Sequence, residues 1–180
     1  MPEATSTAQS LLNNIPRVLQ GFNLFVDGKG FAAKVSECEL PKLAIKAEEY
    51  QPGGYDAPIE VDCGMEKMET TFTLLDFDPY TLKYFGIGHN NQVPVTLRGA
   101  IANGDGSVVP VVIQYTGMWR EIEQPKHAKP GKLEQKVTMS LQYYKLEIGG
   151  ETIHEIDIPN MVRIIGGTDY LADARAAIGV

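Results

Sequence analysis

The sequence has few of the residues on which disulfide frameworks, metal sites and nucleic-acid surfaces depend. Its 180 residues include two cysteines, Cys38 and Cys63, and no CxxC spacing of the kind found in zinc sites. Lys and Arg number 16 against 23 Asp and Glu, so the formal net charge is −7. Tight nucleic-acid binding and adhesion to anionic membranes both need a cationic surface, so this charge disfavours both.

Long hydrophobic runs are also missing. The apolar runs are far shorter than the roughly 20 residues that a membrane-spanning helix needs. Residues 1–10 contain neither the basic nor the apolar region of a signal peptide. Two cysteines alone favour a reducing compartment. We therefore expect a protein that is made in a cytoplasm and does not insert into a membrane.

Recognisable catalytic motifs are absent as well. The sequence contains no GxxxxGK[ST], GxSxG or HExxH pattern. His127 lies among Lys and Pro residues, which favours a solvated position. His154 lies near Glu155 and Asp157, but a role on a strand surface or at an interface is favoured over a catalytic dyad. We expect no enzymatic activity, no cofactor and no bound metal.

What the sequence does contain is the alternation of apolar and polar residues that is typical of half-buried strands. It is clearest from Met68 to Leu74, where every second side chain is apolar or Thr. Turn sequences separate such segments, above all Asn103-Gly104-Asp105-Gly106, which predicts a hairpin. The predicted strands cover residues 21–26, 31–40, 68–74, 92–101, 108–123, 133–148, 151–158 and 161–165. The pattern predicts one domain of mainly antiparallel β structure, a sandwich or partial barrel.

Two short helices complete the prediction. Asp78 and Pro79 suit the start of a flanking helix that runs to Phe85. Thr168 suits the N-cap of a C-terminal helix over residues 169–177. Within 133–148 the apolar residues change phase between Tyr143 and Tyr144, which indicates a β-bulge or a strand that passes between two sheets.

The segment from about Lys46 to Glu66 differs from the rest, because Gly and Pro interrupt it repeatedly. Short extended pieces flank residues 51–58, and Cys63-Gly64-Met65 predicts a second break. Long excursions of this kind are usually functional or disordered. Strands of about fifteen residues with little to protect their edges also template association. These features favour a subunit of an assembly over a monomeric binding module.

Several segments, in their order and spacing, resemble the major tail tube proteins of contractile-tailed phages, the FII family. The resemblance runs from about Pro16 to Val180. The matching segments are Asn23–Gly28, Glu39–Leu43, Gly53–Gly54, Pro58–Met65, Leu75–Asp78, Tyr143–Glu151, Ile153–Asp157, Asn160–Met161 and Leu171–Gly179.

The resemblance implies a structural subunit whose hexameric rings stack into a hollow tube with a continuous β-barrel around the lumen. Contraction of a surrounding sheath then drives the tube through the target envelope. The implied partners are further copies of the chain, the sheath protein, and baseplate and tail-terminator proteins, with the tape-measure protein and DNA inside the lumen. Phages use such a tube to conduct DNA, whereas R-type tailocins carry none, and the sequence is compatible with both. The implied location is the bacterial host cytoplasm during assembly, then the virion or tailocin tail. A type VI secretion-like hexameric ring protein is the alternative.

The resemblance divides the chain into a flexible N-terminal extension, residues 1–15, and a single tail-tube domain, residues 16–180. It also gives the Gly/Pro-rich excursion a role in contacts between subunits or rings, although a mobile surface loop is the other interpretation. The net charge either faces the lumen and repels DNA or keeps free subunits soluble. The interface candidates are Tyr50, Pro52, Gly53, Gly54, Tyr55, Pro58, Ile59 and Met65.

Overall fold

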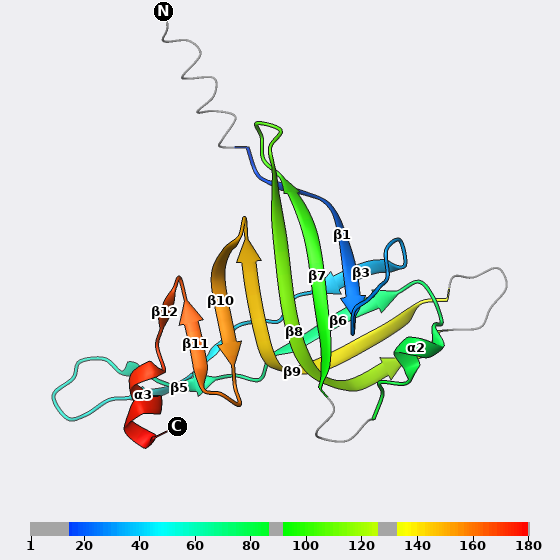
Figure 1. Cartoon of the computed structure of the whole chain (residues 1–180). Helices are drawn as coiled ribbons and strands as arrows, with labels where there is room; N and C mark the ends of the chain where they lie inside the picture. The colour runs from blue at the N-terminus through cyan, green and yellow to red at the C-terminus, as the bar shows by residue number, and fades with distance from the viewer. Residues whose placement is uncertain (1–14, 87–91, 126–132, 180) are drawn as a thin grey trace, which may run out of the picture.

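The computed structural model describes residues 15–86, 92–125 and 133–179, and it consists mainly of antiparallel strands with two short helices (Figure 1). The predicted fold class is therefore confirmed. The predicted extension over residues 1–15 and the candidate surface residue His127 lie outside the described residues, apart from Ile15.

Twelve strands and two helices make up the described fold. In chain order they are β1 (Val18–Val26), β2 (Lys29–Gly30), β3 (Val35–Glu39), β4 (Ile45–Tyr50), β5 (Ile59–Met65), β6 (Glu69–Leu74), α2 (Pro79–Leu82), β7 (Val93–Ala102), β8 (Val108–Glu123), β9 (Gln135–Ile148), β10 (Glu151–Asp157), β11 (Val162–Ile165), β12 (Thr168–Asp169) and α3 (Ala172–Ile178).

Ten of the strands form one sheet that closes partly upon itself. Eight of them follow the order β12-β11-β10-β9-β8-β7-β1-β2, and β9 also pairs with β6, which in turn pairs with β3. The β3–β6 pair thus forms a second layer against β1, β7 and β8. Strands β4 and β5 pair only with each other and form a separate ribbon.

The turn of β9 from one layer into the other depends on a bulge at Gln142. In the pairing of β8 with β9, Thr116 lies opposite Tyr143, but the next residue, Gly117, lies opposite Leu141. The extra residue reverses the alternation, so Leu141 and Tyr144 are both buried although three positions separate them. The N-terminal half of β9 consequently pairs with β6 and the C-terminal half with β10. The phase change predicted from the sequence is confirmed, but it lies at Gln142, so Tyr143 does not share the face of Val137 and Leu141 as the pattern predicts.

The hydrophobic core lies between the two layers. Phe72 of β6 meets Trp119 of β8 edge to face, with 5.5 Å between ring centroids. Cys38 Sγ of β3 lies 3.6 Å from the Tyr115 hydroxyl, so it contacts the opposite layer too. Burial raises the pKa of the Cys38 thiol, which keeps it neutral. The buried apolar side chains are those of Leu24, Val26, Phe31, Met68, Phe72, Leu74, Val93, Val95, Leu97, Val111, Ile113, Tyr115, Trp119, Val137, Met139, Leu141, Tyr144 and Ile156.

The helices begin and end differently from the prediction. Asp78 caps α2 as expected, because its Oδ1 accepts the N–H of Tyr80 at 2.8 Å, but the helix ends at Leu82. The predicted N-cap Thr168 is wrong, since Thr168 belongs to β12 and the helix begins at Ala172. Asp169 Oδ1 instead accepts the N–H of Leu171 at 3.0 Å, which holds the turn before the helix.

Two other segments differ between the prediction and the structure. The strand expected over residues 31–40 begins only at Val35, because Phe31 is buried and opens a turn in which the Lys34 N–H binds the Phe31 carbonyl. At Cys63-Gly64-Met65, where a break is expected, β5 continues through Met65, but its pairing with β4 shifts register, since Met65 lies opposite Ile45 and Asp62 opposite Ala47. Gly64 accommodates this with a φ of 102°.

Candidate assembly surface

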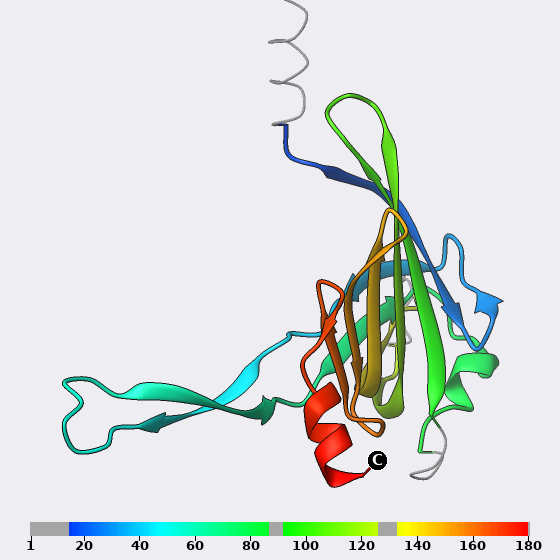
Figure 2. The same cartoon turned by 60° about the vertical axis from the view of Figure 1, so that its left-hand side comes forward.

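The Gly/Pro-rich excursion forms a hairpin, β4–β5, which projects away from the rest of the molecule (Figures 1 and 2). Every residue of β4 and the first five residues of β5 are exposed. In the connecting loop the Tyr55 N–H binds the Pro52 carbonyl at 3.2 Å, and the Gln51 side chain donates to the Tyr55 carbonyl at 3.3 Å. The excursion is therefore an ordered ribbon with a structured tip.

One face of the hairpin is largely apolar. Residues directly opposite each other in an antiparallel pair share a face, and alternate residues share it along the strand. Tyr50 pairs with Ile59, and Glu48 pairs with Val61, so three apolar side chains gather there. Tyr50 is 58% exposed and Ile59 46%. Such a surface is normally buried against another protein.

The other face of the hairpin is acidic. Glu49 lies directly opposite Glu60, and Ala47 lies opposite Asp62. Like charges directly opposite on neighbouring strands destabilise the pair. An isolated two-stranded hairpin is at best marginally stable in water, even without such repulsion.

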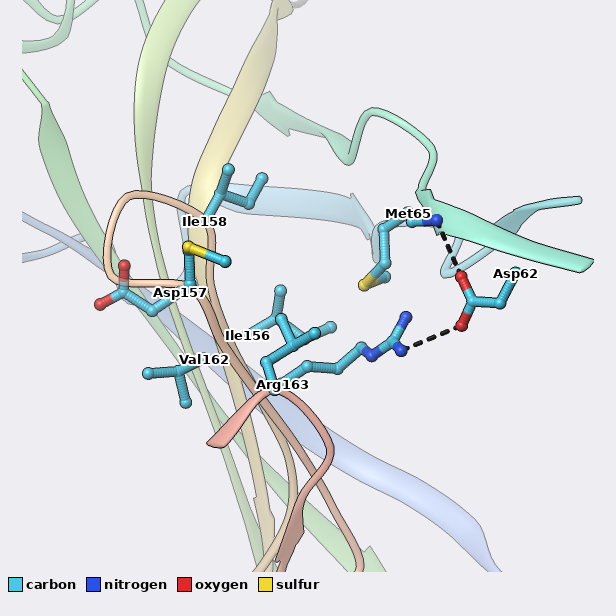
Figure 3. Close-up of a pocket in the computed structure, with 10 residues that line it drawn as sticks. Asp62, Met65, Ile156, Asp157, Ile158, Val162 and Arg163 are labelled. Atoms are coloured by element: carbon cyan, nitrogen blue, oxygen red, sulfur yellow. Dashed lines mark hydrogen bonds and ion pairs between the residues drawn. The ribbon is translucent and has the colours of Figure 1, made fainter. Parts of the chain in front are cut away.

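An ion pair attaches the base of the hairpin to the body. Arg163 Nη2 of β11 lies 2.9 Å from Asp62 Oδ2, and the Gly64 N–H binds Asp62 Oδ1 at 2.8 Å (Figure 3). The Gly64 N–H and then the guanidinium lower the pKa of the Asp62 carboxyl. The acidic face is therefore turned toward the body near its base.

A hollow of about 400 Å³ lies between the hairpin base and the C-terminal strands. Met65, Ile156, Val162 and Leu171 line it, together with the two members of the ion pair. In Figure 3 the Met65 side chain points toward Ile156 and Arg163, whereas Asp157 points away. Met65 is half-buried, so it belongs to the anchored base of the hairpin.

The structure divides the eight interface candidates into two groups. Seven of them lie together at the outer end of the hairpin, and Met65 lies at its base. The outer group is Tyr50, Pro52, Gly53, Gly54, Tyr55, Pro58 and Ile59. Sequence reasoning missed Arg163, whose partner Asp62 is 101 residues distant. Its only signal is a lone cation in the apolar strand Val162–Ile165.

The residues near His154 do not come together as a catalytic set. His154 lies opposite Leu146 and lines a hollow on the inner side of β10, whereas Glu155 lies on the other face of the strand. No three His, Cys, Asp or Glu side chains among residues 15–86, 92–125 and 133–179 are grouped so that they could hold a metal ion. In the same residues no helix has the length and apolar character needed to cross a membrane.

Comparison with known proteins gives consistent results. The family model of phage tail tube protein FII matches residues 16–179. The tail tube protein of Escherichia phage P2 is 27% identical over 170 residues, which cover 92% of this chain and 99% of that protein. The major tail tube protein of Serratia phage KSP20 is 29% identical over 163 residues, with 88% and 93% covered.

The fold resembles a chain of the PVC sheath–tube complex, an extracellular contractile injection system in its extended state. The TM-score is 0.59 at 11% identity, and the match covers 77% of this chain and 96% of that one. The sequence matches span almost the whole chain, and the fold agrees with them. The chain therefore belongs to the family of phage tail tube protein FII and is a structural subunit of an inner tail tube.

Proposed function

We propose that copies of this chain form hexameric rings that stack into a hollow tube, and that the hairpin β4–β5 is the arm by which one copy binds another. The observation that carries the proposal is the exposure of this ribbon on both faces, with Tyr50, Ile59 and Val61 together on one of them. A two-stranded ribbon of this kind gains stability only when another surface covers it.

An open sheet edge supports closure of the ring. Strand β1 pairs with β7 along its length on one side, but on the other side β2 pairs only with Phe25 and Val26. On that side the Phe31 N–H also binds the Leu24 carbonyl, so the free edge within the described residues runs from Val18 to Asn23. This edge is a template for a strand of another chain. Edges joined in this way would give a barrel around a lumen.

The wider role follows from the tube. Its partners are the sheath, which drives the tube through the target envelope by contraction, and the baseplate and tail-terminator proteins at the ends. The tape-measure protein lies within the lumen, and in a phage DNA passes through it without specific binding. The subunit assembles in the bacterial cytoplasm and then forms part of a virion or tailocin tail. Its role is structural rather than catalytic, in one tail-tube domain that begins at residue 16.

Electron microscopy of the purified protein over a range of concentrations tests the proposal. Stacked rings with an open channel are the expected result. Single rings that do not stack would support the type VI secretion-like alternative instead. A chain that stays monomeric at every concentration, also with a tail baseplate added as a nucleus, would overturn the proposal.

A matched pair of variants tests the hairpin. Tyr50→Ser with Ile59→Ser removes the apolar face and should prevent stacking while the subunit keeps its circular dichroism spectrum. Glu49→Gln with Glu60→Gln changes the opposite face and removes like-charge repulsion, so it should leave stacking intact. Deletion of residues 51–58 should also stop stacking. Normal tubes from the serine variant would exclude the hairpin as the binding arm.

A further inference from the structure

The sheet face that points away from the core is polar across four strands, β7, β8, the C-terminal half of β9, and β10. We call this surface the polar panel. One register row crosses it as Thr96, Gln114, Lys145 and Glu155, each opposite the next. The panel consists of Pro94, Thr96, Arg98, Val112, Gln114, Thr116, Tyr143, Lys145, Glu147, Glu155 and Asp157.

The charges at the centre of the panel are matched. Lys145 Nζ lies 2.9 Å from Glu147 Oε1 and 3.9 Å from Glu155 Oε2. The Tyr143 hydroxyl donates to Glu155 Oε1 at 3.0 Å. The hydrogen bond with Glu147 raises the pKa of the Lys145 ammonium, so it stays charged at neutral pH. At the edge of the panel, Arg98 lies over the Phe25 ring at 5.9 Å.

The panel differs chemically from the hairpin. None of the large exposed apolar side chains lies on it, although four of them lie on β4 and β5 and a fifth, Tyr55, lies in the loop between these strands. The cores of protein interfaces are depleted in charged residues, so a face built from ion pairs and hydroxyls suits contact with water. Two cations and three carboxylates give the panel a balance of −1, whereas the whole chain has a net charge of −7.

We propose that the polar panel lines the channel of the tube, and that Lys145 keeps this wall close to neutral by offsetting Glu147 and Glu155. This inference rests on the proposed function. A polyanion then passes along the channel without being held by a cationic wall or strongly repelled by an anionic one. Most of the acidic charge lies elsewhere, as on the hairpin, where it keeps free subunits apart.

Cysteine labelling in assembled tubes tests the position of the panel. Gln114→Cys is compared with Glu37→Cys, both in a Cys63→Ser background, because Glu37 is exposed on the outward face of β3 across the core. A small maleimide should label both variants. A maleimide carrying a polymer too wide for the channel should label only Glu37→Cys in tubes, and both variants in dilute subunits.

The outcomes separate the two proposals. Wild-type protein without tubes would refute the proposed function, and this inference with it. Tubes in which Gln114→Cys reacts with the wide reagent would leave the proposed function standing and exclude the panel from the channel. Tubes in which Gln114→Cys reacts with neither reagent would show a protein interface there, which also overturns the inference.

The charge of the wall is tested with a fluorescent single-stranded DNA oligonucleotide that is sedimented with assembled tubes. Wild-type tubes and Lys145→Gln tubes should retain none. Glu147→Gln with Glu155→Gln makes each panel +1 and should retain the oligonucleotide at about 50 mM salt and lose it by about 200 mM. Glu37→Gln with Glu39→Gln makes the same charge change on the outward face of β3. Equal retention by both double variants, or retention by wild-type tubes, would overturn the role of Lys145.

Discussion

At the scale of single residues, Gly117 shows how closely the neighbouring strands β8 and β9 approach each other at the bulge. A Cβ atom at this position would lie 2.2 Å from the Ser140 carbonyl oxygen, and Gly117 adjoins the bulge of β9. The obstacle is backbone, which cannot move aside as a flexible side chain can. Glycine is therefore required here by space and not by a turn.

Gly117→Ala should consequently lower the free energy of unfolding by about 1–3 kcal/mol, as overpacked cores do. Gly53→Ala in the hairpin loop is the matched control, because nothing lies within 4 Å of a Cβ there and its φ is not positive. Urea unfolding of dilute subunits measures both. An unchanged midpoint for Gly117→Ala would mean that β8 and β9 can move apart at this point.

Asp78 gives a second prediction, on the dependence of stability on pH. Its Oδ2 lies 2.8 Å from Lys29 Nζ, and the ammonium and the Tyr80 N–H lower the pKa of the carboxyl. A lowered folded-state pKa gives stabilisation that is present above the ordinary value of about 3.9 and is lost as the pH falls through the folded value.

Asp78→Asn keeps a good helix cap but loses the charge, so it should cost about 0.2–1 kcal/mol at pH 7. The difference from wild type should be smaller at pH 3, because that pH lies below the ordinary carboxyl pKa of about 3.9, where this stabilisation begins to be lost. Urea unfolding at the two pH values measures this. A difference of the same size at both would assign the loss to the cap and not to the ion pair.

At the scale of elements, the ion pair between Asp62 and Arg163 holds the hairpin at its base. Arg163→Gln should leave the melting temperature of the subunit nearly unchanged, because both partners are partly exposed and the core is untouched. Tube formation should need a higher protein concentration, since the free arm loses entropy when it binds. Arg163→Lys keeps a cation near Asp62, so it should need a lower protein concentration for tube formation than Arg163→Gln.

Arg120→Gln is the control for this prediction, because Arg120 pairs with Glu69 away from the hairpin. Light scattering against protein concentration gives the threshold for assembly of each variant. Identical thresholds for Arg163→Gln and Arg120→Gln would show that the arm needs no anchor.

The elements also show how far sequence reasoning reaches. Strands with one buried face, such as β6 and β8, carry an alternating pattern, and their bounds were predicted closely. The hairpin carries no such pattern because both of its faces are exposed, so Cys63-Gly64-Met65 reads as a break, whereas β5 continues there with a shift of register. The helix α3 was placed too early, because the Asp169 carboxylate accepts the Leu171 N–H of the turn before the helix and the Arg163 N–H of β11. The anchoring by Arg163 depends on a distant pairing that no local pattern encodes.

At the scale of the whole molecule, every copy carries a net charge of −7, so free copies repel one another. Added salt shortens the range of this repulsion to about 10 Å at 0.1 M. The concentration needed for assembly should therefore fall as salt rises, and fall again as the pH approaches the sequence pI of about 5.0. Sedimentation across a salt series measures the protein concentration at which tubes form. Tubes that dissolve as salt is added would instead show that attraction between opposite charges dominates the contacts.

Strand β9 has a mechanical consequence, because its two halves belong to different layers. One continuous backbone joins the polar panel to the layer behind the core, with the bulge at Gln142 as the corner. The layers cannot slide past each other without breaking ladder hydrogen bonds on both sides of that corner. A wall built from such subunits resists shear between its inner and outer surfaces, so a push at one end travels along the tube as compression.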